Sequence, residues 1–290
     1  MKSLKEQVND IVTSKSSKQV KSASLIKLGL RKHEVLMLLG TITNVSKAKA
    51  FKVNALTFGV EIECYNVIRD ALIAEVEQRN ISIQSQRYNH DSAACYKIVS
   101  DCSISGVNGN EVVSPILKGK EGENSLKEVC SSLNAIDAKV NKSTGLHVHF
   151  GAENLSDAHF VNIFKNYAKL EKVIDSFMPE SRKANNNRYC KSITNFSIDS
   201  IETKQGLIRA TNDRYLKVNV QSYLRHRTIE FRQHSGTTDY SKIISWVNFL
   251  RKLINFSFDS EIENCATIEE VPFLTKKEKE FFISRRNQLA

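Results

Sequence analysis

Three short segments of the sequence carry pairs of ionisable side chains spaced two residues apart. The pairs are Glu61 and Glu63, His147 and His149, and Glu230 and Arg232. In each segment the residues that alternate with the pair are apolar. Because successive side chains of a β-strand point to opposite faces, each pair should share one face, about 7 Å apart, with the apolar residues on the other face.

A shared face with several carboxylates and imidazoles would suit a divalent metal ion. Carboxylates held close together repel one another unless a cation lies between them. Carboxylate-dominated ligand sets favour Mg²⁺ or Mn²⁺ over zinc, and they tolerate one imidazole. The competing interpretation is that these are the solvent faces of half-buried strands. It fits any single pair well, but solvent faces are usually filled with Lys, Thr and Ser.

The sequence is rich in arginine near the third pair. Seven of the 14 arginines fall within 51 residues: Arg182, Arg188, Arg209, Arg214, Arg225, Arg227 and Arg232. Arginine binds phosphate and carboxylate groups through two parallel hydrogen bonds. We expect Arg209, Arg214 and Arg225 to be exposed, whereas Arg232 shares a face with Glu230. Carboxylate-bound metals beside arginines are typical of a phosphoryl-transfer site.

The elements that must position these residues are mixed strands and helices without a regular strand–helix–strand rhythm. This order predicts an antiparallel α+β fold. Strands are expected at 58–63, 81–88, 95–100, 111–114, 146–150, 215–222 and 226–233, the last two as a hairpin. Helices are expected at 67–78, 123–136, 157–178, 240–256 and 276–288. Ser156 should cap the third of these and Pro179 should stop it, and a capping box from Thr275 to Glu278 should open the last.

The positive charge of the chain is concentrated near its beginning. Residues 1–54 hold 11 Lys and Arg against three Asp and Glu, and the net charge of the whole chain is +10. We therefore expect a basic, helical N-terminal extension, residues 1–54, followed by a catalytic domain, residues 55–290. A basic arm can contact nucleic acid. We favour a solvated helical arm and expect no nucleic-acid partner.

Composition and cysteine spacing narrow the class of protein. The chain is 41% hydrophobic and 26% charged, as in ordinary folded proteins. No run of about 18 apolar residues occurs, and the first residues lack the apolar segment of a secretory signal. The six cysteines form no CxxC pair. We expect reduced thiols and a cytoplasmic protein with no membrane span.

Four motifs occur in an order that resembles a known family. They are FGVEIE at 58–63, DCS at 101–103 with EVVSP at 111–115, GLHVHF at 145–150 and TIEFR at 228–232. Together they resemble the amidoligase family, relatives of glutamine synthetase and glutamate–cysteine ligase, over roughly residues 56–255. The resemblance implies a funnel of antiparallel strands with helices packed on its outer face, as in the catalytic fold of glutamine synthetase.

The same resemblance implies an activity. Enzymes of this kind join a carboxylate to an amine at the expense of ATP, through an acyl phosphate. The substrates would be small molecules or peptides that carry the carboxylate and the amine. Two or more Mg²⁺ (or Mn²⁺) ions would bridge the nucleotide phosphates and neutralise the developing charge.

The resemblance also assigns roles to individual residues. One metal would be held by Glu63 and Glu111, and the other by Glu61, His147 and Glu230. The catalytic residues would be Arg232, which clamps the transferring phosphoryl group or the acyl phosphate, and His149, which orients the substrate or a group that contacts the metal ligands. The nucleotide would contact Arg182, Asn187, Arg227 and Arg232, and the loop that contains Asn186 and Tyr189 would line the substrate side.

The sequence departs from the family pattern in two places. Family members often have glycine where this chain has Cys102, which leaves the geometry of that turn open, because glycine adopts positive φ at little cost. A third carboxylate for the first metal is not evident, and Glu121 and Glu123 are candidates.

Two other classes of protein remain as alternatives. His147 and His149 followed by Glu153 resemble the metal motif of cupins, which implies a single transition metal and no ATP. The downstream histidine of that motif has no clear counterpart here. A non-enzymatic nucleic-acid binder would use the basic arm and show steeply salt-dependent binding. That class leaves the paired Glu and His residues unexplained.

Overall fold

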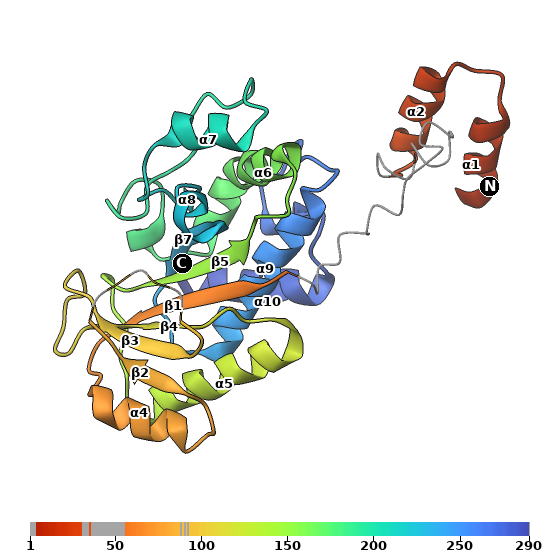
Figure 1. Ribbon diagram of the computed structural model, residues 1–290. Helices are drawn as coiled ribbons and strands as arrows, with labels where there is room; N and C mark the ends of the chain where they lie inside the picture. Colours follow the sequence, from red (N-terminus) through yellow and green to blue (C-terminus); the bar gives the residue numbers. More distant parts are fainter. Residues whose placement is uncertain are drawn as a thin grey trace.

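The fold is built on one seven-stranded sheet (Figure 1). The computed structural model describes residues 4–30, 35, 56–87, 89, 91 and 93–289. The strands are β1 (Phe58–Cys64), β2 (Ile83–Ser85), β3 (Tyr96–Ser100), β4 (Asn110–Val113), β5 (Gly145–Gly151), β6 (Val218–Asn219) and β7 (Thr228–Ser235). Their order in the sheet is β2-β3-β4-β1-β5-β7-β6, and every pairing except β2 with β3 is antiparallel. The predicted α+β class is thereby confirmed.

Helices fill the remaining connections. Those described are α1 (Leu4–Thr13), α2 (Lys18–Lys27), α4 (Arg69–Glu77), α5 (Gly119–Ala135), α6 (Asp157–Ser176), α7 (Lys204–Thr211), α8 (Ser222–His226), α9 (Tyr240–Phe256) and α10 (Lys276–Leu289), with 3₁₀ turns η2 (Glu180–Arg182) and η3 (Ile268–Glu270). The Ser156 hydroxyl accepts a hydrogen bond from His159 N at the start of α6, as predicted. No helix in these described ranges is both long and apolar enough to cross a membrane.

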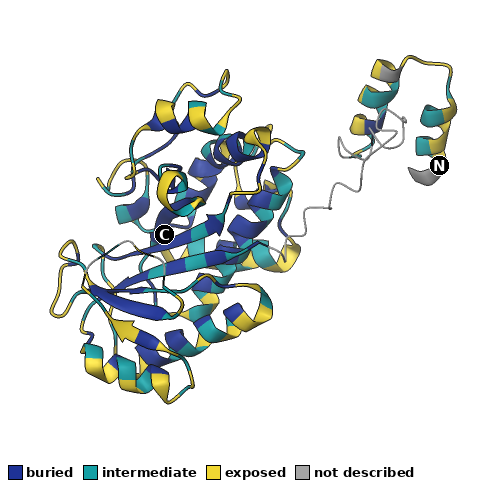
Figure 2. Ribbon diagram, in the orientation of Figure 1, coloured by how far each residue is buried: buried dark blue, intermediate teal, exposed yellow. Residues whose placement is uncertain are grey.

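The core lies between one face of the sheet and helices α5, α6 and α9. On that face Phe231 lies 5.5 Å, centroid to centroid, from the ring of Tyr167 in α6. The Arg251 guanidinium of α9 lies over the ring of Phe58 at 5.4 Å. The hydroxyl of Ser125 in α5 donates to that of Tyr96 at 3.2 Å. Strands β1, β5 and β7 are largely buried (Figure 2). Because their side chains alternate between faces, the polar pairs lie on the face opposite these helices.

Most predicted elements are confirmed within a few residues. The hairpin expected from strands 215–222 and 226–233 is present as the antiparallel pair β6 and β7. Its first strand is shorter than expected, and α8 forms the connection between the two. Helix α7 had not been predicted. The expected capping box is present, since Thr275 N donates to Glu278 Oε2 at 2.8 Å and Glu278 N to Thr275 Oγ1 at 3.4 Å.

The predicted helical extension is described only in part. Helices α1 and α2 pack against each other, and Lys21 Nζ donates to the Val12 carbonyl at 2.8 Å. Ser17 caps α2. Residues 1–3, 31–34 and 36–54 of the predicted extension lie outside the described residues.

A bulge in β7 changes which side chains face the core. Leu146 pairs with His234 but Val148 pairs with Phe231, so β7 has one more residue than β5 between these pairs. As a result two consecutive side chains turn toward the helices. Gln233 accepts a hydrogen bond from the Tyr167 hydroxyl at 2.7 Å, and the His234 ring packs on Trp246 at 5.6 Å.

His234 should make the protein sensitive to acid. Burial and the charge of Arg285 lower the pKa of His234 to about 3, whereas an unfolded histidine titrates near 6.5. As the pH falls below 6.5, His234 becomes protonated in the unfolded chain but stays neutral in the folded chain. The free energy of unfolding therefore decreases between pH 6.5 and 3. We expect a loss of about 2–3 kcal/mol from this residue between pH 7 and 4.5. Urea unfolding of His234→Phe at the two pH values should show a correspondingly smaller difference; equal differences in both proteins would contradict this assignment.

Candidate metal centre and active site

Strand register brings the three predicted pairs together on the face opposite the helices. Glu61 of β1 lies beside His147 of β5, and His149 of β5 lies beside Glu230 of β7. On the other side of β1, Glu63 is paired with Glu111 of β4. Neighbouring strands are about 4.8 Å apart, so residues from four strands meet in one cluster.

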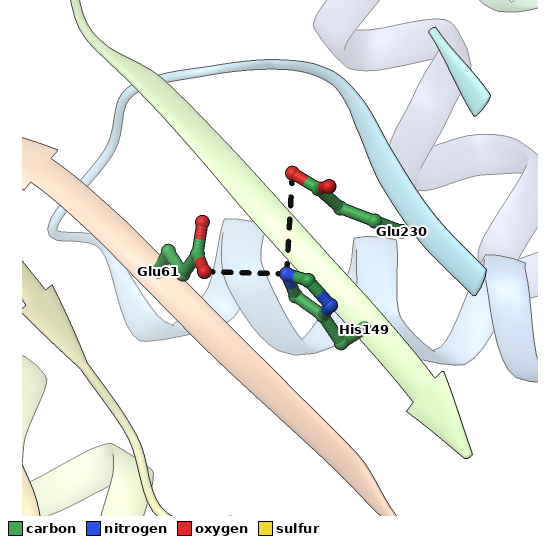
Figure 3. Close-up of side chains that lie close together, drawn as sticks. All are labelled: Glu61, His149 and Glu230. Carbon is green, nitrogen blue, oxygen red and sulfur yellow. Dashed lines mark ion pairs between the residues drawn. The ribbon is translucent and has the colours of Figure 1, made fainter. Parts of the chain in front are cut away.

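The side chains of this cluster are in direct contact. Glu61 Oε2 lies 2.9 Å from His147 Nδ1, and His149 Nε2 lies 3.3 Å from Glu61 Oε1 and 3.9 Å from Glu230 Oε1 (Figure 3). His147 also approaches Glu230, with 3.7 Å between Nδ1 and Oε1. Glu63 Oε2 accepts a hydrogen bond from Gly145 N at 2.6 Å, while its Oε1 lies 3.4 Å from His147 Nε2.

Two overlapping sets of three residues have side-chain atoms close enough together to hold a metal ion. Glu61, His149 and Glu230 form one, and Glu61, Glu111 and His147 form the other, with candidate ligand atoms within 4.8 Å of one another. Glu61 belongs to both. The predicted grouping was Glu63 with Glu111, and Glu61 with His147 and Glu230. Glu63 belongs to neither set, and His149, which had been expected to orient the substrate or a group that contacts the metal ligands, stands with Glu61 and Glu230.

The pKa values of several cluster residues are shifted in different directions. Burial disfavours ionisation of Glu61, but the charge of His149 holds its pKa well below the ordinary value. Burial opposes ionisation of Glu230 as well, and Arg232 lowers its pKa. The pKa of His149 is raised against the effect of burial by these two carboxylates. Glu111 differs, because burial and the neighbouring carboxylates raise its pKa well above normal.

These residues fit a divalent cation. The donor set consists of carboxylate oxygens with imidazole nitrogens, which suits Mg²⁺ or Mn²⁺. His149 Nε2 is buried and, among the described residues, is in contact only with the carboxylates of Glu61 and Glu230, as ion pairs without good hydrogen-bond geometry, whereas its Nδ1 is 3.0 Å from the Thr228 hydroxyl. Metal-binding histidines are usually oriented by a hydrogen bond at one ring nitrogen while the other binds the metal. The ring of His149 has this arrangement, with Nε2 directed at the carboxylates.

Two buried arginines border the cluster. Arg232 Nη1 donates to Glu230 Oε1 and Arg232 Nε donates to the Tyr189 carbonyl at 3.3 Å. Arg182 is 2% exposed, and its Nη2 donates to the Thr144 carbonyl at 2.6 Å. Arg232 thus connects Glu230 of the cluster to the loop at 180–190, and Arg182 connects that loop to the residue before β5.

The other predicted contacts lie further out. Asn187 Oδ1 accepts a hydrogen bond from Tyr189 N, so this side chain shapes its own turn. Asn186 donates to Glu180 and is exposed. Arg227 is exposed, lies over the Tyr223 ring at 5.2 Å and adopts a φ of 57°. Among the described contacts, none of these three residues touches a carboxylate of the cluster.

Three carboxylates considered from the sequence are not part of the centre. Glu123 forms an ion pair with Arg251 Nη1 at 3.0 Å, and Glu121 is exposed on α5. Glu153 is exposed in the turn after β5 and belongs to neither set of ligands, so the cupin-like grouping is not favoured. The DCS turn forms without glycine, because Cys102 has no positive φ and Asp101 Oδ1 accepts a hydrogen bond from Ser103 N.

A cavity of about 1010 Å³ opens onto one side of the cluster. Glu61, Glu111 and His149 form part of its wall. The rest comes from the ends of β1, β4 and β5, from the start of β7, from Asn89 and Asp91 before β3, and from Lys97 within β3. The cavity is large enough for a nucleotide-sized ligand.

Sequence reasoning missed two polar residues of the centre. Asn219 of β6 donates to Glu230 Oε2 at 2.5 Å and fixes that carboxylate. Its signal was the alternation of the polar Lys217 and Asn219 with apolar residues in the run Leu216–Val220. Lys97 lies on the same sheet face among the apolar residues of β3, and a single lysine in such a strand carries no functional signal by itself.

Comparison with protein-family models identifies the family. A model described as "Putative amidoligase enzyme" matches residues 54–254, more than two thirds of the chain. The protein therefore belongs to the amidoligase family, as its motifs had indicated. A search of curated proteins finds no match.

The absence of a side chain at Gly145 leaves room for Arg182 and His147. A Cβ atom there would lie 2.9 Å from Arg182 Nη2 and 3.0 Å from His147 Nε2. We expect Gly145→Ala to displace both side chains and to lower turnover about 10- to 100-fold with little change in thermal stability. In Gly236→Ala the new Cβ would instead lie 2.2 Å from Thr144 Oγ1, so this variant should lose stability. Unchanged turnover in Gly145→Ala would contradict the proximity of these groups to the chemistry.

Proposed function

We propose that the protein is an ATP- and Mg²⁺-dependent carboxylate–amine ligase that forms an amide or peptide bond. The observation that carries this proposal is the pair of ligand sets that share Glu61, beside Arg232, in a chain of the amidoligase family. Two adjacent cations next to a guanidinium are what the transfer of a phosphoryl group requires.

The proposed reaction has two steps. A carboxylate oxygen of the first substrate attacks the γ-phosphorus of ATP, and ADP leaves with the electron pair of the broken P–O bond. The product of this step is an acyl phosphate. The amine of the second substrate, as the free base, then attacks the acyl carbon, and phosphate leaves with the oxygen that came from the carboxylate. The proton that the amine nitrogen loses passes to the released phosphate or to water.

The residues of the centre have distinct proposed tasks. When bound, the metal ions would neutralise the nucleotide phosphates. Glu61 is proposed to contribute to both sites: it would hold one ion with Glu63, Glu111 and His147, and the other with Glu230 and His149. Arg232, already turned toward Glu230, would hold the transferring phosphoryl group by charge-assisted hydrogen bonds. The funnel of the glutamine synthetase-like fold is part of this proposal, with the polar face of β1, β5 and β7 as its inner wall.

Phosphate release tests the reaction class. The purified protein should release phosphate from ATP only when Mg²⁺ and a suitable carboxylate and amine are present, in a panel of amino acids, amines and peptides. With the responsive carboxylate labelled with ¹⁸O, one labelled oxygen should appear in the phosphate. Amide formation with unlabelled phosphate would exclude the acyl phosphate, and AMP as product would exclude the proposed transfer.

A further inference from the structure

Lys97 is a buried cation on the same sheet face as the carboxylate cluster. It is paired with Val113 across β3 and β4, Val113 is paired with Glu61, and Glu61 with His147. Lys97 and Glu61 therefore belong to one row across the sheet, two strands and about 10 Å apart. The lysine is 2% exposed, and it lines the same cavity as Glu61 and Glu111.

The Lys97 ammonium group has only neutral partners among the described residues. Its Nζ donates to Asn89 Oδ1 at 2.7 Å, to the Asp91 carbonyl at 2.7 Å and to the Asn89 carbonyl at 3.3 Å. The carboxylate of Asp91 is turned away to Arg225, 3.1 Å distant. No carboxylate of the described chain lies within ion-pair distance of Lys97.

Lys217 provides the contrast. It is also fully buried, and its Nζ lies 2.9 Å from Glu171 Oε1 and 2.7 Å from Asp175 Oδ1. That arrangement is the usual one, because a buried ammonium is costly unless an opposite charge accompanies it. Lys97 keeps its positive charge uncompensated at the wall of a cavity, which favours an anionic ligand there.

We propose that Lys97 binds a phosphate group of the nucleotide, at the end of the cluster opposite Arg232. This inference rests on the proposed ligase function. The cations bound by the carboxylates would hold one part of the phosphate chain and Lys97 another, at a separation that a triphosphate chain can span. A phosphate oxygen would replace the Asn89 carbonyl, which is the longest of the three contacts and the weakest by its length.

A purely structural role makes a different prediction. If Lys97 only holds the segment that contains Asn89 and Asp91, then Asn89→Ala, which removes one of its two 2.7 Å contacts, should weaken MgATP binding as Lys97→Gln does. If Lys97 binds phosphate, Asn89→Ala should leave nucleotide affinity unchanged or increase it, because a donor is freed.

The experiment measures the binding of MgATP and of adenosine by calorimetric titration of the full chain. Lys97→Gln removes the charge but retains a donor for Asn89, and Lys97→Met removes both. Each should weaken MgATP binding about 10- to 100-fold, the worth of a charged hydrogen bond, and leave adenosine binding unchanged. Lys276→Met, on an exposed part of α10, controls for the loss of one positive charge and should bind MgATP as the parent does.

The outcomes separate this inference from the function on which it rests. If the unaltered protein binds no MgATP, the proposed function fails and the inference fails with it. If the unaltered protein binds MgATP and Lys97→Gln binds it equally well, the inference alone is overturned. The inference is also overturned if Asn89→Ala weakens MgATP binding as much as Lys97→Gln does. Should Lys97→Met fail to fold, Lys97→Gln and Asn89→Ala still decide between the two roles.

Discussion

Replacing Glu61 with glutamine is expected to reduce ATP-dependent ADP formation by roughly 10²- to 10³-fold while the fold remains intact. Glu61 is the residue shared by both ligand sets. The amide has nearly the same size but no charge, so both cation positions lose an anionic ligand. Steady-state assays of ADP release, with circular dichroism and thermal unfolding in parallel, measure the effect.

Two further variants make the Glu61 result specific. Glu230→Gln should behave in the same way, because Glu230 is buried in the same cluster and faces His149. Glu280→Gln removes an exposed carboxylate near Lys276 on α10 and should leave activity at the level of the parent. Full activity in Glu61→Gln, in a protein that does form ADP, would refute the assignment of the metal centre.

Replacing Lys217 with methionine should destabilise the protein by about 3–5 kcal/mol. Lys217 is the cation between Glu171 and Asp175, and the variant would leave both carboxylates without a counter-ion in the protein interior. The remaining oxygens of these carboxylates accept hydrogen bonds from Ile193 N at 2.9 Å and Ala184 N at 3.0 Å. The loss should therefore spread to the loop that positions Arg182.

Urea unfolding of Lys217→Met measures this effect. The matched control is Lys191→Met, because Lys191 also forms an ion pair, with Asp213 at 2.8 Å, but is 44% exposed in its side chain. A surface pair of this kind contributes at most about 1 kcal/mol. Equal stability losses in the two variants would show that burial does not govern the value of the Lys217 interactions.

The sequence predicted the local part of the site well. Alternation of polar and apolar residues is a property of a single strand, so the common face of Glu61 with Glu63 and of His147 with His149 could be derived without a structure. The pairing of Glu61 with His147 and of His149 with Glu230 could not, because register depends on contacts between segments more than 80 residues apart.

Other parts of the site had no sequence signal that could be interpreted locally. The bulge that turns Gln233 and His234 to the same face interrupts a pattern that otherwise alternates regularly. The resemblance placed Arg227 among the nucleotide contacts. Arg227 ends α8 in a left-handed conformation, is exposed and lines the cavity beside the cluster, and its contact with a nucleotide stays a prediction. Glu123 is held by Arg251, a partner 128 residues away.

The most direct test of the account is to count bound Mn²⁺ by electron paramagnetic resonance, with and without a non-hydrolysable ATP analogue. We predict at least two Mn²⁺ ions per chain in the presence of the analogue, and weaker binding of both in Glu61→Gln, which shares its carboxylate between the two sets. Absence of bound Mn²⁺ in the unaltered protein with the analogue, or identical binding in Glu61→Gln, would contradict the claim that this cluster is the metal centre of a nucleotide-dependent ligase.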